Sequence, residues 1–403
     1  MIQTRRHVIQ GALASAALFA LSAPALAQKS GTSFTTWVEN FRKRATARGI
    51  SDKTYDSVMN GLKPDTSVYA LQSAQPEFQE ETWQYINRRA NDWRVSNGKE
   101  ILKEHGALLA RIEREIGVDR YILLALWGVE SAYGDPTIQE RYMRPIFPAL
   151  AALAWGEPRR RAYWEKELLN ALVIVERGWS TPAQMRGSWA GAMGHTQWMP
   201  EVWLNMGFDF DHDGRVSPFG SPADALASTA RYLVKRGDYK AGERWGYEVK
   251  GASGNRPRKL SDWKAAGVAR ANGEALPASN AVMRLWAPER GGPQFLIGQN
   301  FKAVRSYNPS NNYTLAICHL SDRLRGEGHF VKQFPGGERP PTVAELKELQ
   351  ERLTKAGFDT GGTDGRIGTG TQKAIRAYQQ KVGMEPADGY AGLKVLARLR
   401  AGT

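Results

Sequence analysis

An uninterrupted apolar run of nine residues constrains the fold of this chain more than any other feature. It extends from Tyr121 to Val129, and a single acid, Glu130, follows it directly. An apolar run without alternation predicts a helix that other elements cover on all sides. Asp119 is the expected N-cap, and Gly134 and Pro136 are the expected stop signals. Glu130 is therefore predicted in the last turns of a buried helix.

This position should change the acidity of Glu130. Desolvation disfavours an ionised carboxyl group, and the negative end of the helix dipole acts in the same direction. At an unperturbed pKa of about 4.3, roughly one glutamate in 500 is protonated at pH 7, whereas a pKa of about 6 to 7 leaves a tenth to a half available as an acid. Glu130 is thus a candidate general acid. The alternative is a structural glutamate at the helix rim, solvated or paired with an arginine.

The N-terminus has the layout of a cleaved export signal. Two arginines at positions 5 and 6 precede an apolar stretch from Val8 to Leu26, and small residues at 25–27 offer a cleavage site. The arginine pair resembles a twin-arginine signal, and a Sec signal is the alternative. No later segment is apolar for about 18 residues, so no membrane span is expected after cleavage. We predict a periplasmic protein.

The charge of the chain indicates an anionic partner. The formal net charge is +14, and removal of residues 1–27 with their two arginines lowers it to +12. Outside the cytoplasm the available polyanions are cell-wall polymers and membrane surfaces, so nucleic acid is not expected as a partner. Alternatively, the basic residues only keep the protein soluble. Cys318 is the only cysteine, so the mature monomer depends on its hydrophobic cores rather than on a disulfide.

Helical periodicity dominates the chain up to about residue 330. Apolar residues recur at helical spacing from Phe34 onward, and further helices are expected at 160–177, 222–236 and 313–325, whereas strand-like alternation is rare. A segment rich in Pro and Gly at 331–341 predicts a semi-stiff linker. We therefore predict a mainly α protein with a signal at 1–27, a large helical domain at 28–330, the linker at 331–341 and a small module at 342–403.

The C-terminal module should form three short helices. Its first apolar face includes Leu346, Leu349 and Leu353, and a quasi-repeat places Asp364-Gly365 and Asp388-Gly389 before the next two helices. Asp-Gly pairs favour turns. About 60 residues is near the lower limit for an independent core, which favours a binding module over an enzyme.

The chemistry of this chain must come from carboxylates. The sequence contains no His-Glu-x-x-His motif, cysteine cluster, nucleophile elbow or phosphate-binding loop. The small residues of Gly187–Pro200 would let a ligand approach the backbone closely. In this segment Ser188 and Gln197 could hydrogen-bond a ligand, and Trp189 and Trp198 could form apolar platforms for a sugar ring. The alternative is tight packing of helices around aromatic core residues.

A third segment resembles a calcium loop. Asp209, Asp211 and Asp213 occupy the first, third and fifth positions of such a loop, and a glycine follows at the sixth. The twelfth position is Gly220 instead of the usual glutamate, so binding would be weak, although Asp224 could reach back. An ordinary Asp-rich turn is the alternative.

Taken together, these motifs resemble the membrane-bound lytic transglycosylase B group of bacterial murein transglycosylases. The resemblance covers roughly residues 34 to 330 and is carried by four segments, Trp127–Gly134, Pro158–Ala162, Gly187–Pro200 and 292–308. The turn Asp364–Gly368 makes the C-terminal module similar to the small peptidoglycan-binding domain of wall enzymes. Two departures are Ser217, where the family often has an acid or Asn, and Gly194-His195-Thr196-Gln197 in place of Gly-aromatic-Gly-Gln.

The resemblance implies a lysozyme-like helical catalytic domain that cleaves the β-1,4 bond between N-acetylmuramic acid and N-acetylglucosamine. One glutamate, at Glu130, would act as acid and then as base and form 1,6-anhydromuramyl ends. No cofactor is required, and a structural calcium would be held by the three aspartates. The expected partners are glycan strands and other cell-wall enzymes. The positions that would line the glycan groove are Tyr85, Arg160, Arg161, Ser188, Gln197, Asn308 and Tyr313. The two arginines would hold peptide or lactyl carboxylates. Alternatively, they belong to a solvated basic face.

Two other functions remain open from the sequence. A muramidase would hydrolyse the same bond and would need a second acid, for which Asp135 and Glu140 are candidates. A non-catalytic wall-binding scaffold would depend on the C-terminal module alone, and Glu130 would then be a structural acid.

Overall fold

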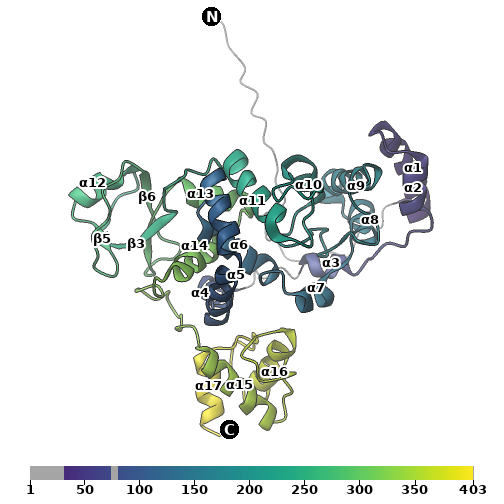
Figure 1. Cartoon of the computed structure of the whole chain (residues 1–403). Coiled ribbons are helices and arrows are strands. Elements are labelled where there is room, and N and C mark those ends of the chain that lie inside the picture. Colours follow the sequence, from purple (N-terminus) through teal and green to yellow (C-terminus); the bar gives the residue numbers. More distant parts are fainter. Residues whose placement is uncertain (1–30, 74–79, 403) are drawn as a thin grey trace, which may run out of the picture.

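The computed structural model describes residues 31–73 and 80–402, and it is mainly helical (Figure 1). The predicted export signal lies outside the described residues. Three lobes lie side by side in Figure 1, and the C-terminal module lies below the middle one. One outer lobe contains the helices α1 (Phe34–Ala47), α2 (Asp52–Met59), α3 (Val68–Ser73), α7 (Pro136–Tyr142), α8 (Ile146–Gly156), α9 (Arg161–Glu176) and α10 (Pro200–Met206).

The middle lobe holds the helices that matter most for the site. Helix α14 packs against α6, α4 and α5, and α11 packs against α13 and α5. The expected helices at 222–236 and 313–325 are confirmed as α11 and α14, and that at 160–177 as the short 3-10 turn η2 (Pro158–Arg160) followed by α9. The bounds are α4 (Thr82–Arg89), α5 (Asp92–Ile116), α6 (Arg120–Ser131), α11 (Pro222–Gly237), α13 (Gln299–Tyr307) and α14 (Asn311–Arg325).

The other outer lobe contains a sheet that the sequence analysis missed. Five short antiparallel strands pair in the order β4-β6-β7-β3-β5, with Tyr247 opposite Leu296 and Leu285 opposite Leu296. The strands have two to five residues, so alternation never extends far enough to stand out against the loops. Trp263 and Leu260 of α12 (Leu260–Ala265) help to form a separate core there. The strands are β3 (Gly246–Lys250), β4 (Arg258–Lys259), β5 (Ala269–Arg270), β6 (Val282–Trp286) and β7 (Gln294–Ile297).

The C-terminal module has the three helices that the sequence predicts, α15 (Val343–Lys355), α16 (Thr369–Lys381) and α17 (Leu393–Arg400), around its own apolar core. Its two Asp-Gly turns are built alike. The amide of Gly365 donates to Gln350 Oε1 at 2.7 Å, and that of Gly389 donates to Gln379 Oε1 at 2.8 Å. Each helix begins five residues after its aspartate, at Thr369 and Leu393.

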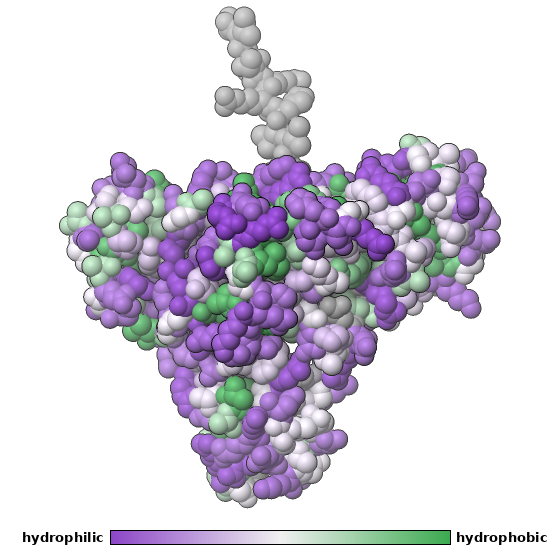
Figure 2. All heavy atoms as spheres, in the orientation of Figure 1, coloured by the Kyte–Doolittle hydropathy of each residue, from purple (hydrophilic) through white to green (hydrophobic). Residues whose placement is uncertain are grey.

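The segment 331–341 is packed at several points between the two parts. Phe334 is buried in the core of the large helical part, and the Glu338 carbonyl accepts a hydrogen bond from Asn87 at 3.0 Å. The visible face of the molecule is predominantly hydrophilic, with small separated apolar patches (Figure 2). No helix within residues 31–73 and 80–402 combines the length and apolar character that a membrane span requires.

Candidate active site

Helix α6 places Glu130 as predicted. Asp119 caps the helix by accepting the Tyr121 amide at 2.8 Å, and the seven residues from Ile122 to Gly128 are all buried. Glu130 itself is half-buried, so it lies at the edge of the core and within reach of a ligand.

The end of α6 lies three residues earlier than the predicted stop at Gly134. Ala132, Tyr133 and Gly134 have φ values of 52°, 64° and 77°, so three consecutive residues adopt the left-handed conformation. Two of them carry side chains, for which this conformation is costly, and such strain is common where a structure orients functional groups. The Ser131 hydroxyl helps to hold the turn by accepting the Gly134 amide at 3.0 Å.

The Tyr133 side chain anchors this turn. Its hydroxyl donates to the Arg94 carbonyl at 2.8 Å, and its ring lies against two glycines. A Cβ on Gly128 would lie 2.5 Å from Tyr133 Cζ, and a Cβ on Gly98 would lie 2.4 Å from the hydroxyl oxygen. The small residues of α5 and α6 therefore make room for the aromatic ring that positions the end of α6.

The hydroxyl of Tyr313 in α14 donates a hydrogen bond to Glu130 Oε1. Burial, followed by the negative charge of Glu130, holds the pKa of Tyr313 well above its ordinary value. Tyr313 is therefore a protonated donor over the whole physiological range. Burial and the negative charge of Glu130 also raise the pKa of Tyr307, at the end of α13. Tyr307 was not among the predicted site residues, although its neighbour Asn308 was.

Tyr85 lies in α4, which packs against α14, and is buried at 1% exposure. The guanidinium of Arg89 covers its ring at 3.6 Å. The structure thus brings three predicted site residues, Tyr85, Glu130 and Tyr313, together from three helices.

The segment 187–200 is mostly a loop, which ends where α10 begins at Pro200. Glycine is required at Gly194, because its φ is 72° and a Cβ there would lie 2.0 Å from the Pro218 carbonyl oxygen. Ser188 Oγ accepts the Ala192 amide at 3.2 Å, and Gln197 Nε2 donates to the Gly194 carbonyl at 3.0 Å. Ser188 and Gln197 are both partly exposed, so their remaining hydrogen-bonding capacity is accessible.

The two tryptophans of this loop differ in exposure. Trp189 is partly exposed and lies 6.4 Å from the ring of Trp164. Trp198 is fully buried and its indole N–H donates to Thr229 Oγ1 at 3.3 Å. The expectation that Trp198 forms a sugar platform was wrong, because the turn that exposes Gln197 directs the next side chain into the core.

His195 joins the loop to α6. Its Nδ1 accepts the indole N–H of Trp127 at 3.1 Å, its Nε2 lies 2.8 Å from the Gly220 carbonyl, and its own carbonyl accepts the Ser131 hydroxyl at 2.6 Å. Both ring contacts are satisfied only by a neutral ring with the proton on Nε2. Burial lowers the pKa of His195, which favours this neutral form. The sequence analysis attached no role to this histidine.

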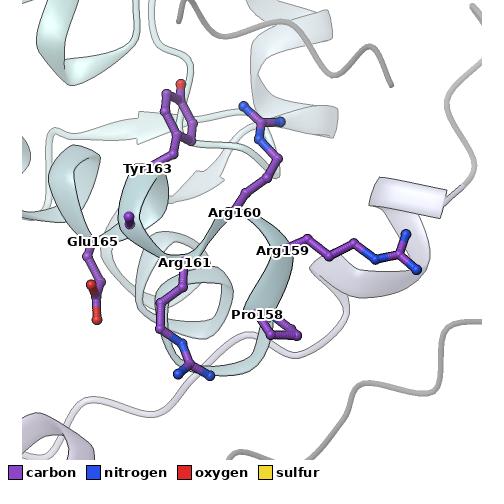
Figure 3. Close-up of a pocket in the computed structure, with 7 residues that line it drawn as sticks. Pro158, Arg159, Arg160, Arg161, Tyr163 and Glu165 are labelled. Atoms are coloured by element: carbon purple, nitrogen blue, oxygen red, sulfur yellow. The ribbon is translucent and has the colours of Figure 1, made fainter. Parts of the chain in front are cut away.

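The two side chains of the predicted arginine pair extend in different directions. It lines an open pocket of about 550 Å³ with Pro158, Tyr163 and Glu165. Figure 3 shows Arg160 extending on the side of Tyr163 and Arg161 in the opposite direction. The Arg160 guanidinium lies 4.5 Å from the Tyr163 ring and 4.9 Å from the Trp164 ring, and Arg161 Nη2 donates to the Trp155 carbonyl at 3.4 Å.

Asn308 follows α13 as its C-cap. Its Oδ1 accepts the Ser310 amide at 3.0 Å, which shapes the turn into α14, and the side chain is partly exposed. Tyr307 beside it donates to the Thr196 carbonyl in the 187–200 loop. This turn therefore connects the residue before Gln197 with the helix that carries Tyr313.

The three aspartates of the calcium-like loop lie together. One carboxylate oxygen from each of Asp209, Asp211 and Asp213 lies within 4.8 Å of the others, which fits shared ligation of one cation. Asp224 reaches back, but it accepts the backbone amides of Phe210 at 2.7 Å and Ser217 at 3.1 Å. Asp224 therefore holds the loop backbone through these two hydrogen bonds.

The chain was compared with known proteins. The family model described as the Transglycosylase SLT domain matches residues 33–322, and that of a peptidoglycan binding domain matches residues 342–399. Membrane-bound lytic murein transglycosylase B of Escherichia coli is 29% identical over 283 residues, which are 68% of this chain and 75% of that protein.

Solved structures of related proteins have the same fold. SltB3 of Pseudomonas aeruginosa, in complex with NAG-anhNAM-pentapeptide, is 39% identical with a TM-score of 0.69, and the match covers 92% of this chain and all of that one. The Escherichia coli lytic transglycosylase Slt35, in complex with calcium, is 24% identical with a TM-score of 0.60, over 76% of this chain and 98% of that one. The chain therefore belongs to the Transglycosylase SLT domain family, with a peptidoglycan-binding domain at its C-terminal end.

Proposed function

We propose that Glu130 is the single acid/base of this peptidoglycan lytic transglycosylase. The observation that carries the proposal is the placement of one half-buried carboxyl group in the last turn of a buried helix, with the Tyr313 hydroxyl as a hydrogen-bond donor. Burial and the helix C-terminus favour the protonated acid, and the tyrosine donor stabilises the carboxylate that forms after proton transfer. The surroundings thus support both protonation states.

One carboxyl group is sufficient for the reaction. Protonated Glu130 donates its proton to the bridging oxygen between C1 of N-acetylmuramic acid and C4 of N-acetylglucosamine, and the bond from C1 to this oxygen breaks. An oxocarbenium-like or acetamido-assisted intermediate remains. The Glu130 carboxylate then removes the proton from the C6 hydroxyl of the same muramic acid, and O6 bonds to C1. This step consumes no water, and a hydroxyl held within the substrate has a high effective molarity.

The hydrolytic alternative requires a second carboxylate. The Asp135 carboxylate forms an ion pair with Arg366 at 2.8 Å and accepts the Thr137 amide at 2.9 Å. Partial burial acts to raise its pKa, but the hydrogen bonds from Thr137 and Arg366 outweigh it and lower the pKa. Glu140 is exposed on α7. Asp135 is thus committed to a structural contact, which favours the reaction with one carboxyl group.

The remaining groove residues follow from the same geometry. We propose that Tyr85, Ser188, Gln197, Asn308 and Tyr313 contact the glycan, since they converge on Glu130 or lie in the loops beside it. The Arg160 guanidinium lies over the rings of Tyr163 and Trp164, and Arg161 extends away from Arg160. We therefore assign the glycan no contact with Arg161.

The decisive experiment is a digest of purified peptidoglycan by residues 28–403, with the products identified by mass spectrometry. Lytic transglycosylation gives anhydro ends that are lighter by one water than hydrolysis products. Glu130→Gln should keep its fold and its binding to peptidoglycan but lose about 10²- to 10⁴-fold in turnover. Glu140→Gln, which changes an exposed acid nearby, is the matched control and should retain activity. Turnover by Glu130→Gln near that of the wild type would refute the assignment.

We further propose that Asp209, Asp211 and Asp213 hold a structural calcium ion. Three carboxylates supply fewer than the six to eight oxygens that calcium prefers, so backbone carbonyls and water would complete the site. The ion would reduce the repulsion between the three aspartates. Calcium should therefore raise the melting temperature of the wild type but not that of the double variant Asp211→Asn/Asp213→Asn. Magnesium should raise the melting temperature of the wild type less than calcium does. Equal shifts for both proteins would exclude this site.

The domain boundaries and the location of the protein complete the proposal. We assign residues 1–27 to an export signal, 28–330 to the catalytic domain, 331–341 to the linker and 342–403 to the peptidoglycan-binding domain, in a monomeric periplasmic protein. The basic mature chain suits an anionic wall polymer.

A further inference from the structure

A cavity of about 580 Å³ lies between the C-terminal module and the catalytic domain. Residues of α4, α5, α6 and α7 form one wall, and residues of α15, α16 and the loops that follow them form the other. Figure 1 shows the module below α4 and α5. Among the described residues that line this cavity, Asp364 is the only acid, whereas five arginines line it: Arg88, Arg89, Arg94, Arg141 and Arg366.

Specific contacts hold the two walls together. Arg366 forms its ion pair with Asp135 across the cavity mouth, and its guanidinium lies 4.7 Å from the Trp93 ring. Arg141 Nη2 donates to Thr369 Oγ1 at 3.0 Å. The cavity is therefore a joint product of the two parts.

The positive charge in this cavity is incompletely balanced. Arg88 and Arg89 share one carboxylate, that of Glu80, at 2.6 and 2.8 Å. Arg94 forms no ion pair with a described residue, and its guanidinium donates to the carbonyls of Gly128 and Arg88. Burial, together with the charge of Arg89, lowers the pKa of Arg94 to about 10. A buried cation without a counter-ion is unfavourable, so this wall favours an anion.

The cavity reaches the end of α6, the helix that carries Glu130. Val129 and Ala132 line it, on either side of Glu130 and Ser131 in the chain. A muramic acid residue held at Glu130 carries its peptide on the lactyl group, so the peptide of a bound strand can enter this space.

We propose that the cavity between the two domains binds the carboxylates of the peptide stem on the glycan strand. The proposal rests on the proposed function, because it assumes a strand at Glu130. Arginine suits this ligand, since its planar guanidinium binds carboxylates through two parallel hydrogen bonds. The peptide stem becomes a ligand of both domains at once, at a site apart from Arg160 and Arg161.

The test is calorimetric binding of three ligands to the full mature chain. They are NAG-NAM-pentapeptide, the same compound with its peptide carboxylates amidated, and NAG-NAM without peptide. None contains the bond that the enzyme cleaves, so binding is measured without turnover. We expect amidation to weaken binding by about tenfold or more, which is the range for hydrogen bonds to charged groups.

Two variants locate the effect. Arg141→Gln changes an exposed side chain, and Arg366→Gln changes the module wall. Each should weaken binding of the acid form about tenfold and leave the amidated and peptide-free ligands unchanged. Arg398→Gln removes the same charge from an exposed position of the module outside the cavity and should have no effect.

Equal affinity for the acid and amidated peptides would overturn the proposal, as would equal losses in Arg141→Gln and Arg398→Gln. Small-angle scattering of Arg366→Gln separates loss of the site from release of the module. The digest of peptidoglycan measures product chemistry, so a negative result in the binding test does not affect the assignment of Glu130. Conversely, a digest without anhydro products would contradict the proposed reaction whatever the binding test shows.

Discussion

At the scale of single residues, one contact sets the surroundings of the proposed acid/base. Tyr313 and Glu130 are 183 positions apart in the chain, and the phenol of one donates to the carboxylate of the other. Because burial and the nearby negative charge raise the pKa of Tyr313, this phenol keeps its proton throughout the reaction. It can therefore stabilise the carboxylate of Glu130 without competing for the proton.

Tyr313→Phe tests this contact. Loss of a hydrogen bond to a charged group typically costs about 1.5 to 3 kcal/mol, so kcat should fall by roughly 10- to 100-fold. Tyr247→Phe, at a partly exposed tyrosine of β3 outside the cavity, is the control and should retain wild-type kcat. Steady-state kinetics on soluble glycan fragments make the comparison. A change below about twofold in Tyr313→Phe would show that the donor has no part in turnover.

At the scale of elements, the end of α6 depends on close packing with α5. Tyr133 fits over Gly98 and Gly128 because neither has a side chain. Gly98→Ala would place a Cβ 2.4 Å from the Tyr133 hydroxyl oxygen, so we expect a loss of about 1 to 3 kcal/mol in the free energy of unfolding.

The matched control for Gly98→Ala lies eight positions further along α5. A Cβ on Gly106 would meet no atom within 4 Å, so Gly106→Ala should be neutral or stabilising by up to about 1 kcal/mol. Urea denaturation gives both values. Equal effects of the two substitutions would mean that Tyr133 adapts freely.

His195 links α6 to two loops, and its titration should couple pH to stability. The pKa of His195 in the folded protein lies below the unfolded value of about 6.5, so the unfolded chain takes up a proton first on acidification. This contribution to stability is present above pH 6.5 and is lost as the pH falls toward the folded pKa.

The variant His195→Gln isolates this contribution. It removes the titrating group, so its free energy of unfolding should decrease less between pH 7.5 and 5.5 than that of the wild type. Other histidines titrate in both proteins and cancel in the difference. If the free energy of unfolding changed with pH in the same way in both proteins, His195 would not be a source of the pH dependence.

At the scale of the whole molecule, Tyr390 belongs to the module by sequence but to the catalytic domain by packing. It is 7% exposed, its ring lies 4.9 Å from that of Trp83 in a T-shaped arrangement, and its hydroxyl contacts Asn87 Nδ2 at 3.3 Å. It belongs to the core cluster of the catalytic domain rather than to that of the module.

Tyr390→Ala should therefore release the module without unfolding it. We expect a larger radius of gyration in small-angle scattering and unchanged helix content. Leu353→Ala, a fully buried residue of the module's own core, should instead unfold the module, at a cost of about 2 to 5 kcal/mol. An unchanged radius of gyration in Tyr390→Ala would mean that polar contacts alone hold the module.

The sequence was sufficient where local interactions decide the structure. The apolar run and Asp119 predicted the buried helix that carries Glu130, and the Asp-Gly pairs predicted the turns of the module. Such features depend on residues a few positions apart. The strands of residues 246–297 were missed for the opposite reason, because two to five residues carry too little alternation and their pairing is long-range.

The sequence by itself determined that one acid ends a buried helix and that a small helical module follows a basic catalytic domain. Only the tertiary structure decided which group this acid meets, since Tyr313 reaches it from α14, which packs against α6. It also decided that Trp198 is buried, that Arg160 and Arg161 diverge, and that arginines of two domains share one cavity. Periodicity and capping depend on residues a few positions apart, whereas these contacts depend on several elements that pack together although they are far apart in the sequence.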